Sequence, residues 1–170
     1  MTVIICMSAS GLFVPPMLIF PRKNMSMHLL RGAPVGSIAA VHPSGWVQSN
    51  LFTQWFQHFL DHVKPSADSP VLLIFDGHYS HTRNIEVIDL ARNNHVVMVS
   101  LPPHSTHKLQ PLDKTFMGPI KVYYSEEIRK WIRQNNRAHL TLLNSLGRHM
   151  SKCKPVKLQP MGSEPPVCIL

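Results

Sequence analysis

The stretch "LLIFDGHYSH", residues 72–81, decides the fold class of this chain. Four apolar residues lead directly into Asp76, and Gly77, His78 and His81 follow within five positions. The run "VLLIF", residues 71–75, is short, apolar and without alternation, which is typical of a strand covered on both faces of a parallel sheet. Functional groups of open α/β sheets collect at the carboxyl ends of such strands. Asp76 is therefore the first candidate site residue.

A second strand is predicted shortly after this stretch. The segment "TRNIEVIDLARNN" predicts a helix that starts near Thr82 and ends at Asn93 and Asn94. The run "VVMVSL", residues 96–101, predicts another strand that is buried on both faces. We therefore expect residues 71–101 to form a strand–helix–strand unit whose two strands are parallel.

An antiparallel hairpin is predicted before this unit. Thr2–Ser8 and Pro15–Phe20 read as its two strands, with Gly11 in the turn. Residues 21–48 show little periodicity and are expected to be loop or short irregular strand.

Two helices are predicted from the spacing of their apolar residues. The segment 50–63 has an apolar stripe that we expect to be core, with Asn50 as its N-cap. A later helix is expected from about Phe116 to Gln134, with Pro119 in its first turn. The stripe residues are Phe52, Trp55, Phe56, Phe59, Leu60 and Val63 in the first helix, and Ile120, Tyr124, Ile128 and Trp131 in the second.

Length and composition limit the classes of protein. The 170 residues fit one domain, and the formal net charge of +8 favours an anionic partner, most often nucleic acid. The alternative is a basic soluble domain with no such partner. Three scattered cysteines suggest no disulfide framework. No stretch approaches the ~20 apolar residues of a membrane helix, so no membrane association is expected.

Two aspartates follow successive predicted strands. Asp76 ends the first, and the loop after the second leads to Asp113. Carboxylates that meet at one rim of a sheet suit Mg²⁺ or Mn²⁺, and two such ions can activate water and stabilise the leaving oxygen in phosphodiester cleavage. The alternative is that Asp76 caps a helix and Asp113 is an ordinary acid in a helix's first turn.

Four histidines form two H-x-x-H units, His78 with His81 and His104 with His107. Four imidazoles could bind Zn²⁺. The alternative, which we favour, is that they have structural or substrate-contacting roles in loops.

Basic residues are concentrated late in the chain. Between Lys114 and Lys157 there are ten, against only Glu126 and Glu127. Such a stripe can bind DNA phosphates, with an affinity that falls as salt rises. The alternative is a solvated helix face with a Glu126–Lys130 pair. The candidate DNA-binding residues are Lys108, Lys114, Lys121, Arg129, Lys130 and Arg133.

Two longer motifs are more specific than the spacing of single residues. "LLIFDGHYSH" together with "VVMVSLPPHSTHKLQPLDKTFMGPIK" resembles the DDE-type endonuclease domain of pogo, Tigger and jerky-like transposases, and the resemblance covers about residues 1–134. It implies an RNase H-like α/β fold with a mixed sheet, and three acidic residues that hold two Mg²⁺ or Mn²⁺ ions. Asp76 matches the second acidic position and Asp113 the third. The four histidines would then orient these carboxylates through hydrogen bonds.

The chain departs from this pattern at its start. The family's first acidic residue lies on a strand before the hairpin, and no Asp or Glu occurs here before Asp61. We therefore expect the first strand to be missing. The inner edge of the hairpin and the edge of strand 71–75 would then lack their shared partner, and open edges favour self-association.

These observations lead to an expectation for the whole chain. Residues 1–137 are expected to form a DDE-type endonuclease domain that is incomplete at its N-terminus, and residues 138–170 a weakly structured tail. The function expected is that of a transposase-derived nuclear domain that acts on or binds DNA, with its metal-dependent cleavage and strand transfer lost. A non-catalytic DNA-binding or interaction module and a zinc-binding structural domain are the alternatives.

Overall fold

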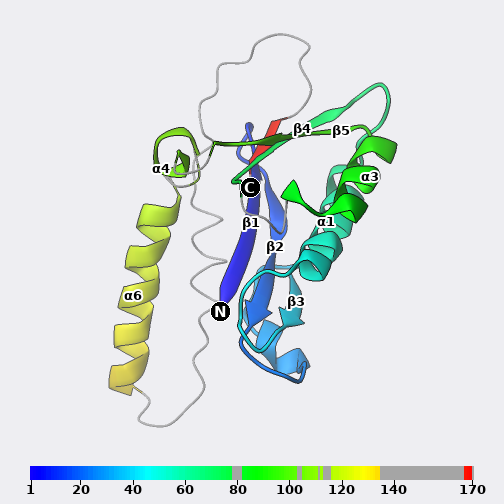
Figure 1. Cartoon of the computed structure of the whole chain (residues 1–170). Helices are drawn as coiled ribbons and strands as arrows, with labels where there is room; N and C mark the ends of the chain where they lie inside the picture. The colour runs from blue at the N-terminus through cyan, green and yellow to red at the C-terminus, as the bar shows by residue number, and fades with distance from the viewer. Residues whose placement is uncertain (78–81, 103–104, 111, 113–115, 135–166, 170) are drawn as a thin grey trace.

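The computed structural model describes residues 1–77, 82–102, 105–110, 112, 116–134 and 167–169. Within them the chain is a mixed α/β protein with one six-stranded sheet, of strand order β3-β2-β1-β6-β4-β5. Helices α1 and α3 lie on one side of this sheet and α6 on the other (Figure 1). The elements are β1 (Thr2–Ser8), β2 (Phe13–Phe20), the short 3-10 helix η1 (Met27–Leu30), β3 (Ile38–Val41), α1 (Ser49–Val63), β4 (Val71–Phe75), α3 (Ile85–Asn93), β5 (Val96–Ser100), α4 (Thr106–Leu109), α6 (Met117–Gln134) and β6 (Val167–Ile169).

The predicted hairpin is confirmed. β1 and β2 pair antiparallel, from Thr2 opposite Ile19 to Met7 opposite Phe13. Gly11 has a φ of 87°, which favours glycine, and its N–H donates to Ser8 O. β2 begins two residues earlier than expected. Part of the segment 21–48 forms β3, which pairs parallel to β2.

The strand–helix–strand unit is confirmed, with one correction. β4 and β5 pair in parallel and in step, Val71 with Val96 through to Phe75 with Ser100. The expectation that the second strand is buried on both faces is wrong, because Val97 and Val99 are 58% and 42% exposed. The physical reason is that α3 covers only the face of β5 that carries Val96, and β5 is the outer strand of the described sheet.

The centre of the sheet also corrects an expectation. β6 lies between the hairpin and the parallel unit, antiparallel to β1 and parallel to β4. Its Ile169 is opposite both Met7 of β1 and Ile74 of β4. The two edges predicted to lack a shared partner therefore have one at these positions. That partner comes from the stretch 138–170, which the sequence suggested to be a weakly structured tail.

The larger core lies between α1 and the sheet, and the aromatic rings of α1 pack against one another along the helix. The ring centroids of Phe52 and Trp55 are 5.2 Å apart, and those of Trp55 and Phe59 are 5.6 Å apart. All three side chains are fully buried, as the apolar spacing predicts. The N-cap is Gln48 rather than Asn50, and it makes no side-chain capping hydrogen bond.

The opposite face of the sheet has a smaller core. Leu112 and Phe116 pack there against Ile5, Met7 and Leu18. The rings of Phe13 and Phe116 are 5.2 Å apart. Only the beginning of α6 joins this cluster, through its partly buried Met117 and Ile120. Pro119 lies in the first turn of α6, as predicted.

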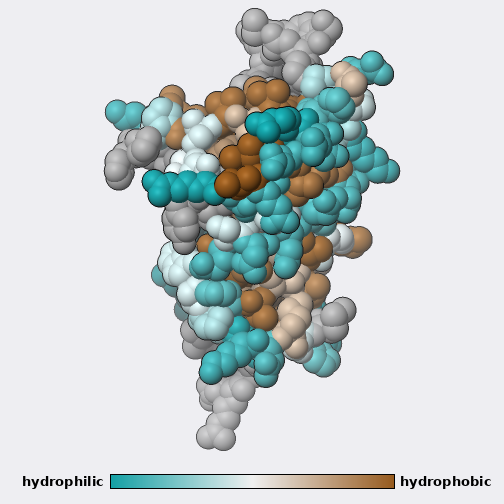
Figure 2. All heavy atoms as spheres, turned by 45° about the vertical axis from the view of Figure 1, so that its right-hand side comes forward, coloured by the Kyte–Doolittle hydropathy of each residue, from teal (hydrophilic) through white to brown (hydrophobic). Residues whose placement is uncertain are grey.

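The outer surface of α1 and α3 is mainly hydrophilic, with apolar side chains visible between the polar ones (Figure 2). In the described part of the chain, no helix combines the length and the apolar character needed to cross a membrane.

Candidate functional site

Asp76 follows the last residue of β4 and is half-buried. The Leu101 N–H donates to Phe75 O over 2.9 Å, so the β4–β5 pairing continues to the point where Asp76 emerges. A Cβ at Gly77 would approach Leu101 O to 3.1 Å. Glycine therefore lets the chain leave β4 close against the end of β5. The carboxylate stands at the strand end predicted from the sequence.

The strand register gives the level of Asp76 across the sheet. Met7, Ile169 and Ile74 are opposite one another. β4 and β1 run in opposite directions on either side of β6. Asp76, two residues after Ile74, is therefore level with Ile5, two residues before Met7. Leu112 packs in the same cluster as Ile5. Leu112 is thus buried on the face of the sheet that carries Ile5.

Several candidate residues lie outside the described part of the chain. They are Asp113, His78, His81, His104 and Lys114. His107 is a residue of α4, where the backbone is described but its side chain is not. The meeting of the two aspartates and the four-histidine zinc site therefore stay predictions. Among the described residues there is no group of three or more His, Cys, Asp or Glu side chains that could hold a metal ion.

The other candidate basic residues are on the surface. Lys108 in α4 is exposed, and so are Lys121, Arg129, Lys130 and Arg133 along α6. The Lys130 Nζ lies 3.2 Å from Glu127 Oε1, so the ion pair forms at i,i+3 with Glu127 and not with Glu126 as the solvated-face alternative supposed. An exposed pair of this kind contributes little to stability.

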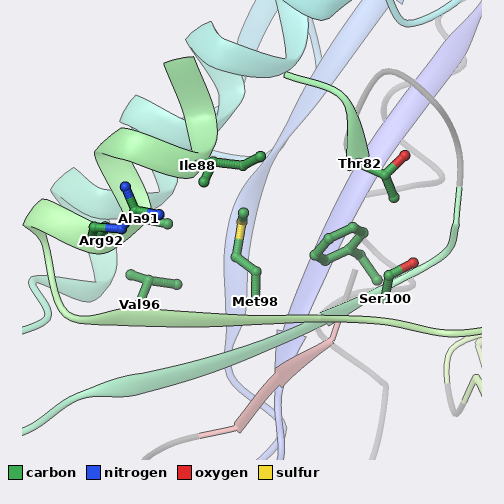
Figure 3. Close-up of a pocket in the computed structure, with 8 residues that line it drawn as sticks. Thr82, Ile88, Ala91, Arg92, Val96, Met98 and Ser100 are labelled. Atoms are coloured by element: carbon green, nitrogen blue, oxygen red, sulfur yellow. The ribbon is translucent and has the colours of Figure 1, made fainter. Parts of the chain in front are cut away.

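A pocket of about 540 Å³ lies between α3 and the strands β4 and β5. Thr82 and Ser100 stand at one end of it and Arg92 at the other, with Ile88 and Met98 between them (Figure 3). Most of its lining is apolar, and Asp76 is not among the lining residues. Its lining does include Phe75, which directly precedes Asp76.

A histidine pair on α1 went unnoticed in the sequence. His58 Nε2 donates to Pro15 O over 2.9 Å, and His62 Nδ1 donates to His58 O over 2.9 Å. Their ring centroids are 4.3 Å apart. Burial lowers the pKa of His58 below its ordinary value of about 6.5, because it removes water from the charged form. The i,i+4 spacing is the signal that could have shown this pair.

The mixed sheet, with a carboxylate at the end of a parallel strand, defines a mixed α/β domain with a candidate site at the end of β4. A family model described as "DDE superfamily endonuclease" matches residues 1–153. The match covers most of the chain, so the chain belongs to the DDE superfamily endonuclease family. Domains of this family act on DNA and generally depend on divalent metal ions.

A curated relative gives a narrower comparison. A protein of Cochliobolus lunatus named "MFS-type transporter clz9" is 33% identical over 147 residues. The aligned region is 85% of this chain but 16% of that protein, so the chain spans about a sixth of the relative's length. No solved structure matches the chain.

Proposed function

We propose that this chain is a nuclear, transposase-derived domain of the pogo, Tigger and jerky-like group that acts on or binds DNA. The observation that carries the proposal is the position of Asp76, half-buried at the carboxyl end of β4 in a chain of the DDE family. The carboxyl ends of parallel strands are where such sheets hold their reactive groups.

Asp76 fits a divalent ion by its donor chemistry. Carboxylate oxygens are the ligands that Mg²⁺ and Mn²⁺ prefer, and a pair of such ions would supply water activation and leaving-group stabilisation. Asp113 is the proposed second carboxylate. Its neighbour Leu112 is buried in the cluster that includes Ile5, a residue level with Asp76, and this supports the role. The histidines at 78, 81, 104 and 107 are proposed to orient the two carboxylates.

Among the described residues, no third carboxylate is assigned to the proposed site. Asp61, the first acidic residue of the chain, is an exposed residue of α1 that accepts a hydrogen bond from Gln57. The three residues of β6, which lie beside β4, carry no carboxylate.

The DNA contacts are proposed to be made by α4 and α6. Five candidate basic residues of these helices are exposed, and α6 lies on the side of the sheet opposite α1 and α3 (Figure 1). Each phosphate contact releases bound counterions, so affinity should fall with salt. The five are Lys108, Lys121, Arg129, Lys130 and Arg133.

Cleavage is tested with Asp76→Asn. We expect this change to abolish any Mn²⁺-dependent nicking of plasmid DNA, whereas DNA binding by the variant persists. Asp68→Asn, in an exposed turn, is the matched control and should leave nicking as it was. Nicking that is unchanged in Asp76→Asn would remove this residue from the proposed site.

Binding is tested separately by titration of labelled duplex DNA at several salt concentrations. We expect the double variant Arg129→Ala/Arg133→Ala to weaken binding and to lower the salt slope by about 2, one unit for each lost phosphate contact. Arg22→Ala, a change at an exposed arginine in the loop after β2, is the control. A flat response of the unaltered chain to salt would contradict phosphate binding.

A further inference from the structure

Two histidine rings lie side by side on α1, one helical turn apart. The ring centroids of His58 and His62 are 4.3 Å apart, and the ring planes are inclined by 59°. Residues at i and i+4 share one face of a helix, and two histidines at this spacing can bind the same metal ion. Two rings that only pack against each other have the same spacing, so the use of their nitrogens decides between packing and metal binding.

Each ring has one nitrogen bound to a backbone carbonyl oxygen. His58 Nε2 donates to Pro15 O of β2, and His62 Nδ1 donates to His58 O, both over 2.9 Å. A carbonyl oxygen only accepts, so these two nitrogens carry the protons, and in the neutral rings His58 Nδ1 and His62 Nε2 keep their lone pairs. Histidines that bind metals usually make such a hydrogen bond at their other nitrogen, because it fixes the tautomer and the orientation of the ring.

There is space beside the second ring for an ion and its water ligands. His62 is exposed, and His58 is half-buried. Gly36 has no side chain at the place where a Cβ would stand 3.8 Å from His62 Nε2. Its φ of 82° favours glycine, so the backbone keeps this space clear. Asp61, on the same turn of α1, interacts electrostatically with His58, and its negative charge favours a bound cation.

The separation of the rings favours one class of ion. With metal–nitrogen bonds of ~2.0–2.1 Å, two rings bound at a right angle have centroids roughly 4.5 Å apart, and two rings bound at a tetrahedral angle roughly 5.2 Å apart. The observed 4.3 Å agrees with the right angle. Cu²⁺ and Ni²⁺ take tetragonal arrangements with right angles, whereas structural Zn²⁺ sites are tetrahedral. Of these ions, Cu²⁺ binds nitrogen ligands most tightly.

We propose that His58 and His62 form a Cu²⁺-binding site on α1. His58 Nδ1 and His62 Nε2 bind the ion at a right angle, and water fills its other positions. Among the described residues no third His, Cys, Asp or Glu side chain joins them, so two imidazoles hold the ion. An ion held by both rings would link two successive turns of α1 and stabilise the end of this helix.

This site is separate from the proposed DNA-processing site in position and in chemistry. Its ligands are nitrogens on α1 beside β2, whereas Asp76 follows β4 and offers oxygen. Imidazole suits Cu²⁺ and Ni²⁺, and carboxylate suits Mg²⁺ and Mn²⁺. Neither proposal therefore depends on the other.

The test is paramagnetic broadening of amide signals in the ¹⁵N-labelled full-length chain at pH 7.5, with CuCl₂ added below one equivalent. The signals of Gly36, Asp61 and His62 should be lost first. His62→Gln should retain them, because one imidazole remains and the chelate is gone. His28→Gln, at an exposed histidine of η1, is the matched control and should behave as the unaltered chain does.

A second measurement tests the choice of ion. With an equal amount of ZnCl₂ present the broadening should persist, because Cu²⁺ binds more tightly than Zn²⁺. Signals restored by Zn²⁺ would contradict a right-angled Cu²⁺ site. Broadening on α1 that survives in His62→Gln would overturn the proposal, because the pair would not be needed. So would broadening confined to signals away from α1 and Gly36, which would place the ion at other histidines.

Discussion

Helices α1 and α6 both have apolar stripes that include aromatic residues, yet they meet the sheet in different ways. In α1 the side chains of Phe52, Trp55 and Phe59 are fully buried. In α6 the side chains of Tyr123 and Tyr124 are 46% and 39% exposed. An apolar stripe thus predicts that a helix forms, but does not establish that its whole length is packed.

The difference comes from where each helix is anchored. The buried residues of α1 recur along the helix, from Leu51 to Leu60, so nearly its full length covers the sheet. The strongest anchors on the other face, Leu112 and Phe116, come before α6 begins. α6 follows from this fixed point and runs alongside the sheet, set apart from its strands (Figure 1). On one face of the sheet the core is therefore formed mainly by α1. On the other face it is formed by Leu112 and Phe116, in the segment that leads into α6.

The largest expected effect breaks the α1 side of this comparison. Trp55→Ala should lower the free energy of unfolding by about 3–5 kcal/mol, because it removes a fully buried ring from a packed core. Tyr124→Ala, a matched truncation on α6, should change it by less than about 0.5 kcal/mol. Urea unfolding followed by circular dichroism measures both. Similar costs for the two would show that α6 is as firmly packed as α1.

An intermediate effect is expected where α1 meets α3. The Asn84 side chain is buried and donates to Ser49 O over 2.8 Å and to Thr53 Oγ1 over 3.0 Å. Its Oδ1 also accepts from the Val87 N–H at the start of α3. Asn84→Ala should cost about 1–2 kcal/mol, since it removes an N-cap and leaves partners unpaired.

The same unfolding assay measures this change, and Asn93→Ala at an exposed position is its control. A cost for Asn84→Ala no greater than that of the control would show that α1 and α3 are held together by their apolar contacts alone.

The smallest expected effect is a pH dependence at the end of α1. Burial lowers the pKa of His58, so the folded chain binds fewer protons at this residue than the unfolded chain does. Its contribution to stability is complete above the unfolded pKa of about 6.5. It is lost progressively as the pH falls from there towards the lowered pKa of the folded state.

Urea unfolding between pH 5 and pH 8 measures this dependence. His58→Gln should flatten it, whereas His28→Gln, at an exposed residue, should not. A slope that survives in His58→Gln would assign the pH dependence to another group.

The elements that the sequence predicts well are those with strong local patterns. The aromatic spacing of 50–63 and the apolar run 71–75 each coincide with an observed element to within one residue. β3 was harder to predict, because "IAAV" is only four residues long and pairs with a strand far from it in sequence. Val97 and Val99 show that an apolar run does not establish burial on both faces, because only one face of the outer strand β5 is covered.

For the candidate site, the comparison between sequence and structure concerns the position of Asp76 alone. Asp76 lies where a carboxylate after a short buried strand is expected, because strand length fixes where the chain leaves the sheet. The histidine pair at His58 was missed, since its partner is a backbone carbonyl of Pro15 on another element. β6 could not be foreseen either, because three residues carry too little pattern to identify a strand.

The central position of β6 also determines when the sheet can be completed during synthesis. Met7 and Ile169 are opposite each other but lie roughly 160 positions apart along the chain. The hairpin and the β4–β5 unit emerge from the ribosome long before their link does. Until Ile169 has been made, two apolar strand edges face each other without it, and edges of this kind invite aggregation or capture by a chaperone.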